Sequence, residues 1–149
     1  MASEITVERK DGLAVVSLNR PDKLNALTLE MRVELTECFR RMHTDPEVRA
    51  ILLRAEGRAF CAGADISTMG KDDVWGDRAR LFRAHQMILA IYNCEKPVVA
   101  AVRGPAVGIG LSMALAWMSC CFQIQRNSVR SFARSAWPRM AARRSFFKT

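Results

Sequence analysis

The sequence has no long hydrophobic run, and none of its apolar stretches approaches the roughly 20 residues that a membrane-spanning helix requires. Its first residues lack the basic segment followed by an apolar segment that marks a secretory signal. Cys-x-x-Cys pairs with metal spacing are also missing, although there are five cysteines, namely Cys38, Cys61, Cys94, Cys120 and Cys121. We therefore expect a cytoplasmic protein with reduced thiols, no metal site and no membrane association.

Acidic residues are absent from the last part of the chain. The 149 residues are 50% hydrophobic and 26% charged, which suits one domain with a buried core. The formal net charge is +8 at pH 7, and residues 117–149 hold seven basic residues and no acidic one, so the excess charge lies almost entirely there. The composition therefore divides the chain into a domain at 1–116 and a basic tail at 117–149.

Local patterns in the first half predict a hairpin and a helix. Extended segments at 5–9 and 13–18 flank Asp11-Gly12, a dipeptide that favours a tight hairpin turn. Thr28 is a good N-cap for a helix that ends at Asp45-Pro46. Apolar residues recur along this segment at helical spacing and predict one core-facing stripe: Met31, Leu35, Cys38 and Met42.

Two further apolar runs, at 50–53 and 97–102, show no alternation, which is typical of parallel strands covered on both faces. Between them, 77–92 reads as a helix whose inward residues are Leu81, Ala84, Ile88 and Ile91. Strand, helix and strand in this order predict an α/β fold.

Each of these two strands leads into a loop rich in glycine and alanine, at 59–66 and 104–110. Ligands of α/β sheets bind beyond the carboxyl ends of strands, and small residues let a ligand approach the backbone. Two free N–H groups converging there on one oxygen would form an oxyanion hole. For Gly108 and Gly110 taken alone, the alternative is that the glycines only make tight turns.

Three blocks of sequence follow one another in order across residues 4–116. They are Asn19-Arg20-Pro21 with Asn25-Ala26-Leu27, then the loop at 59–66, then the stretch from Lys96 to Gly110. In wording and spacing they resemble the crotonase superfamily of enoyl-CoA hydratases and isomerases, which belong to fatty acid metabolism. The resemblance implies a crotonase-like spiral of ββα units, with this chain holding the N-terminal portion only, and it implies an acyl-CoA substrate.

The resemblance also implies a site. Its oxyanion hole would consist of the backbone N–H groups of Ala64 and Ile109, and the coenzyme A would be part of the substrate, with no separate cofactor. Further substrate contacts would map onto Lys23, Leu24, Ala62, Gly63, Asp65, Ile66 and Gly108. For Lys23, a plain solvated lysine in a turn is an equal alternative.

One position departs from the family's hydratases, which carry a catalytic glutamate two residues after the second loop. Ser112 stands there, and serine with an ordinary pKa does not serve unaided as a general base. The sequence of residues 104–109 is closer to that of the isomerase branch, in which one carboxylate further along the chain moves the proton. That carboxylate would lie beyond residue 116. Because of Ser112 and the sequence of residues 104–109, we favour a parent isomerase over a hydratase.

The family pattern stops at Ala116, and a shift of reading frame explains the change. Trp and Met have single codons, so Trp117-Met118 must read as aspartate in the other frame, which is the residue expected there. With suitable choices among the synonymous codons, residues 135–142 read as Gly-Leu-Ala-Pro-Asp-Gly-Gly-Ala in the other frame. This string resembles the family block that holds the isomerase base. The alternative is a genuine divergent or spliced tail. A shifted tail predicts a truncated, inactive chain ending in a disordered or poorly packed segment.

Two other functions remain open. The tail could bind nucleic acid or an anionic surface through its six arginines, which are Arg126, Arg130, Arg134, Arg139, Arg143 and Arg144. Their irregular spacing and the lack of any nucleic-acid motif disfavour this function. The chain could also be a non-catalytic acyl-CoA binder. Family members form trimers or hexamers, and this chain would lack their usual C-terminal interface.

Overall fold

The computed structural model describes residues 3–68 and 74–116, so the predictions for the tail at 117–149 lie outside the described residues. In chain order its elements are β1 (Ile5–Lys10), β2 (Leu13–Leu18), η1 (Pro21–Lys23), α1 (Leu29–Thr44), β3 (Ala50–Ala55), η2 (Ile66–Thr68), α2 (Val74–Tyr92), β4 (Val98–Ala100) and α3 (Ile109–Leu115). The architecture is mixed α/β, as predicted. Among these helices, none is both long and apolar enough to cross a membrane.

The four strands form one sheet in the order β1-β2-β3-β4. The pair β1 and β2 is antiparallel, whereas β2 with β3 and β3 with β4 are parallel. The predicted hairpin is confirmed, and its turn residues Asp11 and Gly12 have φ angles of 51° and 82°. Two positive φ values match the twist of paired strands, which is why Asp-Gly is favoured at this position.

Helix α1 begins where the sequence predicts. The Thr28 hydroxyl accepts a hydrogen bond from the Met31 amide at 3.1 Å, which satisfies one of the free donors of the first turn. The predicted stripe is confirmed at Met31, Leu35 and Met42, all at most 1% exposed. Cys38 is only half-buried at the margin of this stripe, and the fully buried Phe39 beside it fills the core.

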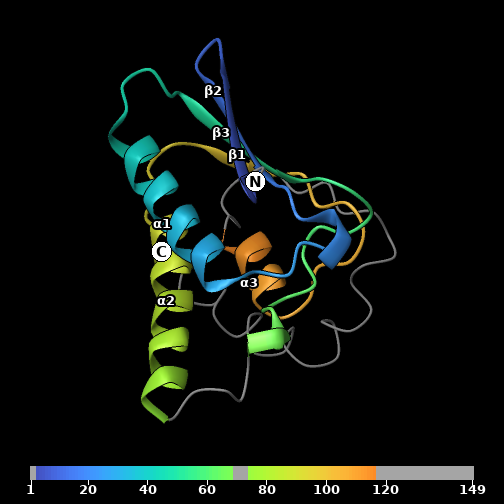
Figure 1. Ribbon diagram of the computed structural model, residues 1–149. Helices are drawn as coiled ribbons and strands as arrows, with labels where there is room; N and C mark the ends of the chain where they lie inside the picture. The colour runs from blue at the N-terminus through green and yellow to red at the C-terminus, as the bar shows by residue number, and fades with distance from the viewer. Residues whose placement is uncertain (1–2, 69–73, 117–149) are drawn as a thin grey trace, which may run out of the picture.

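The helices that the structure describes cover only one face of the sheet (Figure 1). In β4, Val98 and Ala100 are buried while Val99 between them is 40% exposed. The expectation that this strand is covered on both faces is therefore wrong for the described part of the chain. The strand is also shorter than the apolar run at 97–102, because it pairs with β3 through only three residues.

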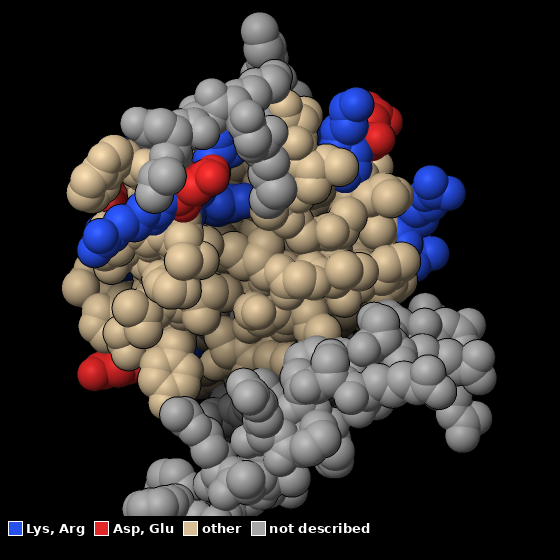
Figure 2. Space-filling view, turned by 90° about the horizontal axis from the view of Figure 1, so that it is seen from below, with Lys and Arg blue, Asp and Glu red and all other residues tan. Residues whose placement is uncertain are grey.

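Helix α2 packs against α1 with most of the face that the spacing predicted. Ala84 and Ile91 are buried and Ile88 packs against the core, whereas Leu81, also expected in the core, is 58% exposed. Met87, which the spacing did not select, is completely buried, so periodicity located this face only approximately. Its exposed large apolar side chains are Trp75, Leu81, Phe82, Leu89 and Tyr92. Viewed from below, the molecule presents mainly uncharged residues, with charged side chains near the margin (Figure 2).

Asn25 connects the segment after β2 to the loop after β3. Its side chain is completely buried and donates hydrogen bonds to the carbonyls of Glu56 and Ala59, both at 2.8 Å. Its amide oxygen accepts from the Arg20 backbone N–H, also at 2.8 Å. The residue has a φ of 54°, in the left-handed region that asparagine tolerates better than most residues.

We expect Asn25→Ala to lower the free energy of unfolding by about 2 to 4 kcal/mol, because it removes three buried hydrogen bonds. Asn19→Ala is the matched control, since Asn19 donates a longer and exposed bond to Ser3 O at 3.3 Å. Urea denaturation followed by circular dichroism measures both changes. Equal losses for the two variants would contradict this assignment of Asn25.

Candidate functional site

The two small-residue loops lie against each other and against the segment that leads into α1. The Leu27 amide donates to Gly63 O at 2.8 Å, and the Asp65 amide donates back to Leu27 O at 3.0 Å. In the second loop, the Val107 amide donates to Cys61 O at 2.9 Å. Loops that leave neighbouring strands are thereby joined at the same edge of the sheet.

Glycine is required where these loops meet. Gly63 has a φ of 106°, and a Cβ at this position would lie 3.2 Å from Val107 O. At Gly110 a Cβ would lie 2.5 Å from the Cβ of Cys61, so any larger residue would push α3 away from the first loop. The glycines therefore allow the close approach of two backbones, in addition to forming turns.

A cavity of about 530 Å³ opens between the two loops and helices α1 and α2. Among its lining residues are Ala64 and Ile109, the two positions whose N–H groups the resemblance selects. Within the described part of the chain, neither of these amides donates a hydrogen bond to another group. Ile109 is the first residue of α3, where an amide has no partner inside the helix.

The remaining predicted residues divide into two groups. Asp65 and Ser112 also line the cavity, and the Ser112 hydroxyl donates to Gly108 O at 3.4 Å. The other predicted substrate contacts do not line it, and these are Lys23, Leu24, Ala62, Gly63, Ile66 and Gly108. Two of them contact each other, since the Ala62 amide donates to Leu24 O at 2.9 Å.

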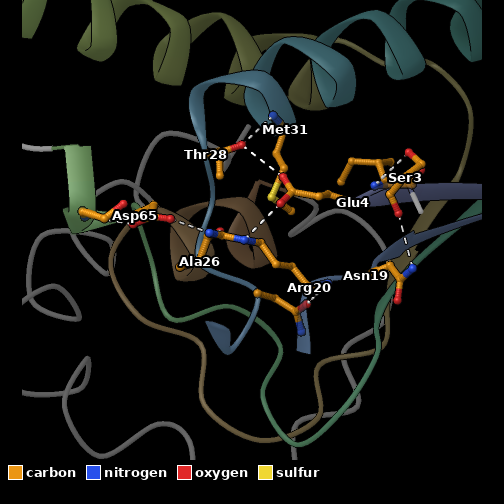
Figure 3. Close-up of polar contacts among 11 residues, drawn as sticks. Ser3, Glu4, Asn19, Arg20, Ala26, Thr28, Met31 and Asp65 are labelled. Atoms are coloured by element: carbon orange, nitrogen blue, oxygen red, sulfur yellow. Dashed lines mark hydrogen bonds and ion pairs between the residues drawn. The ribbon is translucent and has the colours of Figure 1, made fainter. Parts of the chain in front are cut away.

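Arg20 holds the first loop in place through a polar network (Figure 3). Its guanidinium pairs with Asp65 at 2.6 Å and with Glu4 at 3.0 Å, and it also donates to Ala26 O at 3.0 Å. Glu4 in turn accepts a bond from Thr28, the cap of α1, at 3.3 Å. One side chain therefore connects the N-terminal strand, the start of α1 and the loop that carries Ala64.

The Asp65 carboxylate is strongly stabilised in its charged form. Hydrogen bonds from Ser67, followed by the contact with Arg20, lower its pKa from 3.8 to about 2. A carboxylate with so low a pKa is a weak base. Asp65 is therefore suited to fixing the loop and unsuited to accepting a proton from a substrate.

Several lining residues carry no signal that sequence motifs would detect. Helix α1 contributes Arg32 to the lining. Helix α2 contributes the polar residues Asp77, Arg80 and His85 and the apolar residues Leu81, Ala84 and Ile88. Leu81, which the spacing assigned to the core, thus faces a cavity instead, while Ile88 packs against the core and also lines the cavity. Only the packing of α2 against α1 and α3 brings these side chains to the two loops.

The cysteines near this region are inert thiols. Burial raises the pKa of Cys61 to about 11 and also that of Cys38 to about 11, so both remain protonated near neutral pH. In the described residues no group of three or more His, Cys, Asp or Glu side chains is arranged to hold a metal ion. The chemistry available at the cavity therefore comes from backbone amides and charged side chains.

Comparison with known proteins agrees with this arrangement. The family model for enoyl-CoA hydratase/isomerase matches residues 8–133, so the chain belongs to this family, part of the crotonase superfamily. The match continues past Ala116 into the basic tail. The structure matches crotonase-fold proteins, including an enoyl-CoA hydratase/isomerase from Xanthobacter autotrophicus at a TM-score of 0.72, 33% identity, 78% of this chain and 44% of that chain.

Two curated relatives show how far the similarity extends. A probable enoyl-CoA hydratase of Mycobacterium tuberculosis, EchA14, is 43% identical over 106 residues, which are 70% of this chain and 41% of that protein. The 4-chlorobenzoyl coenzyme A dehalogenase-2 of an Arthrobacter species is 40% identical over 116 residues, which are 75% of this chain and 42% of the relative. The chain spans about two fifths of the length of these relatives.

The ion pair of Asp65 predicts a pH dependence of stability. Because the pKa is about 2 in the folded chain and 3.8 for a free aspartate, the unfolded state binds the proton first on acidification. The stability that Asp65 contributes is complete above pH 4 and is lost as the pH falls toward 2. Asp65→Asn should therefore flatten the loss of unfolding free energy between these values, measured by urea titrations at each pH.

The control for this experiment is Asp22→Asn, which removes an exposed carboxylate from the same part of the chain. This variant should keep the wild-type slope. A parallel slope for wild type and Asp65→Asn would show that the contacts of the Asp65 carboxylate with Ser67 and Arg20 do not stabilise the fold.

Proposed function

We propose that the cavity receives the acyl group of an acyl-CoA and that the N–H groups of Ala64 and Ile109 bind its thioester oxygen. The observation that carries this proposal is that both residues line one cavity while their amides have no acceptor among the described residues. The family of the chain supports the choice of substrate class. The relatives are named as enzymes that act on enoyl-CoA and chlorobenzoyl-CoA esters, so the thioester is their common element.

Two N–H donors in this arrangement would stabilise an enolate. Removing a proton beside a thioester places negative charge on the carbonyl oxygen, and each fixed donor in analogous sites contributes about 3 kcal/mol to the transition state. Backbone groups are preorganised, so no reorganisation is needed as the charge develops. In this proposal the Lys23 to Leu24 turn and the segment from Ala62 to Ile66 contact the coenzyme A portion.

The base that moves the proton lies beyond Ala116 in this proposal. Ser112 occupies the cavity wall but has no carboxylate, and Asp65 is held charged by Arg20 and Ser67. The remaining lining carboxylate, Asp77, is 62% exposed and lies 3.6 Å from Arg80. A two-glutamate hydration is therefore disfavoured, and we infer a parent enzyme of the enoyl-CoA isomerase type with one later carboxylate.

This chain by itself is inactive in our proposal. A reading-frame shift after Ala116 removes the base, and the chain covers about two fifths of its relatives, so much of their length has no counterpart here. Sequencing the gene across the codon for Ala116 and reading the other frame to its stop tests the shift directly.

We expect no measurable hydration or double-bond migration of a short enoyl-CoA by the purified 149-residue chain. The version with the frame restored after Ala116 should be active, because a positioned base contributes about 10²- to 10⁴-fold to such a reaction. Spectrophotometric assays of the two proteins side by side provide the measurement. Comparable turnover by both would refute the inactivity, and binding without turnover would identify the chain as an acyl-CoA binder.

The oxyanion hole has a separate test at Ile109. Ile109→Pro deletes the N–H group at the first position of α3, where proline is well tolerated in helices. In the frame-restored protein this variant should reduce kcat by about 10²- to 10³-fold, as the loss of one oxyanion donor does elsewhere.

Ile109→Val is the control, since it shortens the side chain and keeps the N–H group. Near wild-type activity for Val with a large loss for Pro supports the assignment. Retention of activity by Ile109→Pro, with an unchanged circular dichroism spectrum, would contradict the assignment of the Ile109 N–H group as a donor.

A further inference from the structure

Arg32 is a buried cation in the wall of the cavity. It lies on α1, is only 5% exposed, and lines the same cavity as Ala64 and Ile109. Several of its neighbours in that wall are apolar, among them Leu27, Leu81 and Ile88. A charged group in such surroundings is costly unless an opposite charge or several acceptors compensate it.

The partners that Arg32 has are few and uncharged. Its Nη2 donates to Leu27 O at 3.2 Å, and its Nη1 lies 3.5 Å from Arg80 O, which is long for a hydrogen bond. Its Nε is buried and has no partner among the described residues. A guanidinium carries more donors than these contacts use, so Arg32 retains unsatisfied N–H groups beside the cavity.

The carboxylates of the cavity do not neutralise it. Asp65 pairs with Arg20 at 2.6 Å, and Asp77 lies near Arg80 on the same helix at 3.6 Å. Within the described residues Arg32 makes no ion pair. Burial, followed by the charge of Arg80, lowers its pKa, and Cys61 and Asp65 oppose this with smaller effects.

Arg32 and Arg80 both line the cavity, and Asp77 lies beside Arg80, whereas Arg32 has no carboxylate partner among the described residues. An anion in the cavity would offset the charge of Arg32 and accept its unused N–H donors. A carboxylate matches the planar guanidinium in two parallel hydrogen bonds, which makes it the best complement in shape and charge.

We propose that Arg32 binds a second carboxylate at the far end of the acyl group, so that the cavity selects the CoA thioester of a dicarboxylic acid. This inference rests on the proposed function, because it takes the thioester oxygen to lie at Ala64 and Ile109. The phosphates of coenzyme A are the other source of negative charge. They are common to all acyl-CoA esters, so a comparison of two esters separates the sources.

The test compares the affinity of the 149-residue chain for two saturated esters that cannot be turned over. One is glutaryl-CoA, and the other is its uncharged isostere, in which an isopropyl group replaces the carboxylate. Isothermal titration calorimetry should show that the wild-type chain binds glutaryl-CoA about tenfold to a hundredfold more tightly, as expected for a hydrogen-bonded charge pair.

Arg32→Gln should abolish this preference while leaving the affinity for the isostere within about twofold of wild type. Glutamine removes the positive charge and keeps an uncharged amide donor at this position. Arg40→Met is the matched control, because Arg40 is an exposed arginine of the same helix that pairs with Glu37 at 3.1 Å. It should keep the full preference.

The outcomes separate the two proposals. Equal affinity of the wild-type chain for both esters, or an equal loss of both in Arg32→Gln, overturns the role of Arg32 and leaves the acyl-CoA site standing. Binding of neither ester overturns the proposed function, and the carboxylate site with it. The wild-type comparison requires no variant, so it remains decisive even if Arg32→Gln does not fold.

Discussion

The ion pair between Arg20 and Asp65 is the contact on which the candidate site depends most. At 2.6 Å it joins the segment after β2 to the loop after β3. The parallel pairing of these strands brings both segments to one edge of the sheet, and the ion pair then fixes how they meet there. Since Asp65 follows Ala64 directly, holding its carboxylate also restrains the backbone at Ala64, a residue that lines the cavity. Arg20 reaches Glu4 as well, so the N-terminal strand shares this support.

The features that could be predicted from the sequence are those determined within a few residues. Asp11-Gly12 has a strong local preference for a hairpin turn, and Thr28 caps α1 through an amide three residues away. The two small-residue loops could be located because each follows a strand. Their meeting in one cavity with Ala64 and Ile109 agrees with the family resemblance, although the substrate contacts at Lys23 and Ile66 lie outside the described lining.

The features that escaped prediction depend on residues far apart in the sequence. Leu81 belongs to the predicted stripe and Met87 does not, and only the packing of α2 against α1 leaves the first exposed and buries the second. Arg32 reads as an ordinary charged residue of an amphipathic helix. Its burial follows from Leu27 O on one side and α2 on the other, and neither neighbour is visible in a local pattern.

The proposed placement of the site's donors in the main chain has a genetic consequence. Every amino acid except proline supplies an N–H group, so most missense changes at Ala64 or Ile109 would preserve the proposed donor itself. The vulnerable codons are those of Gly63 and Gly110, where even one added methyl group would meet Val107 O or Cys61. Selection would therefore act more strongly on these two glycines, which set the spacing of the loops, than on the residues that supply the proposed donors.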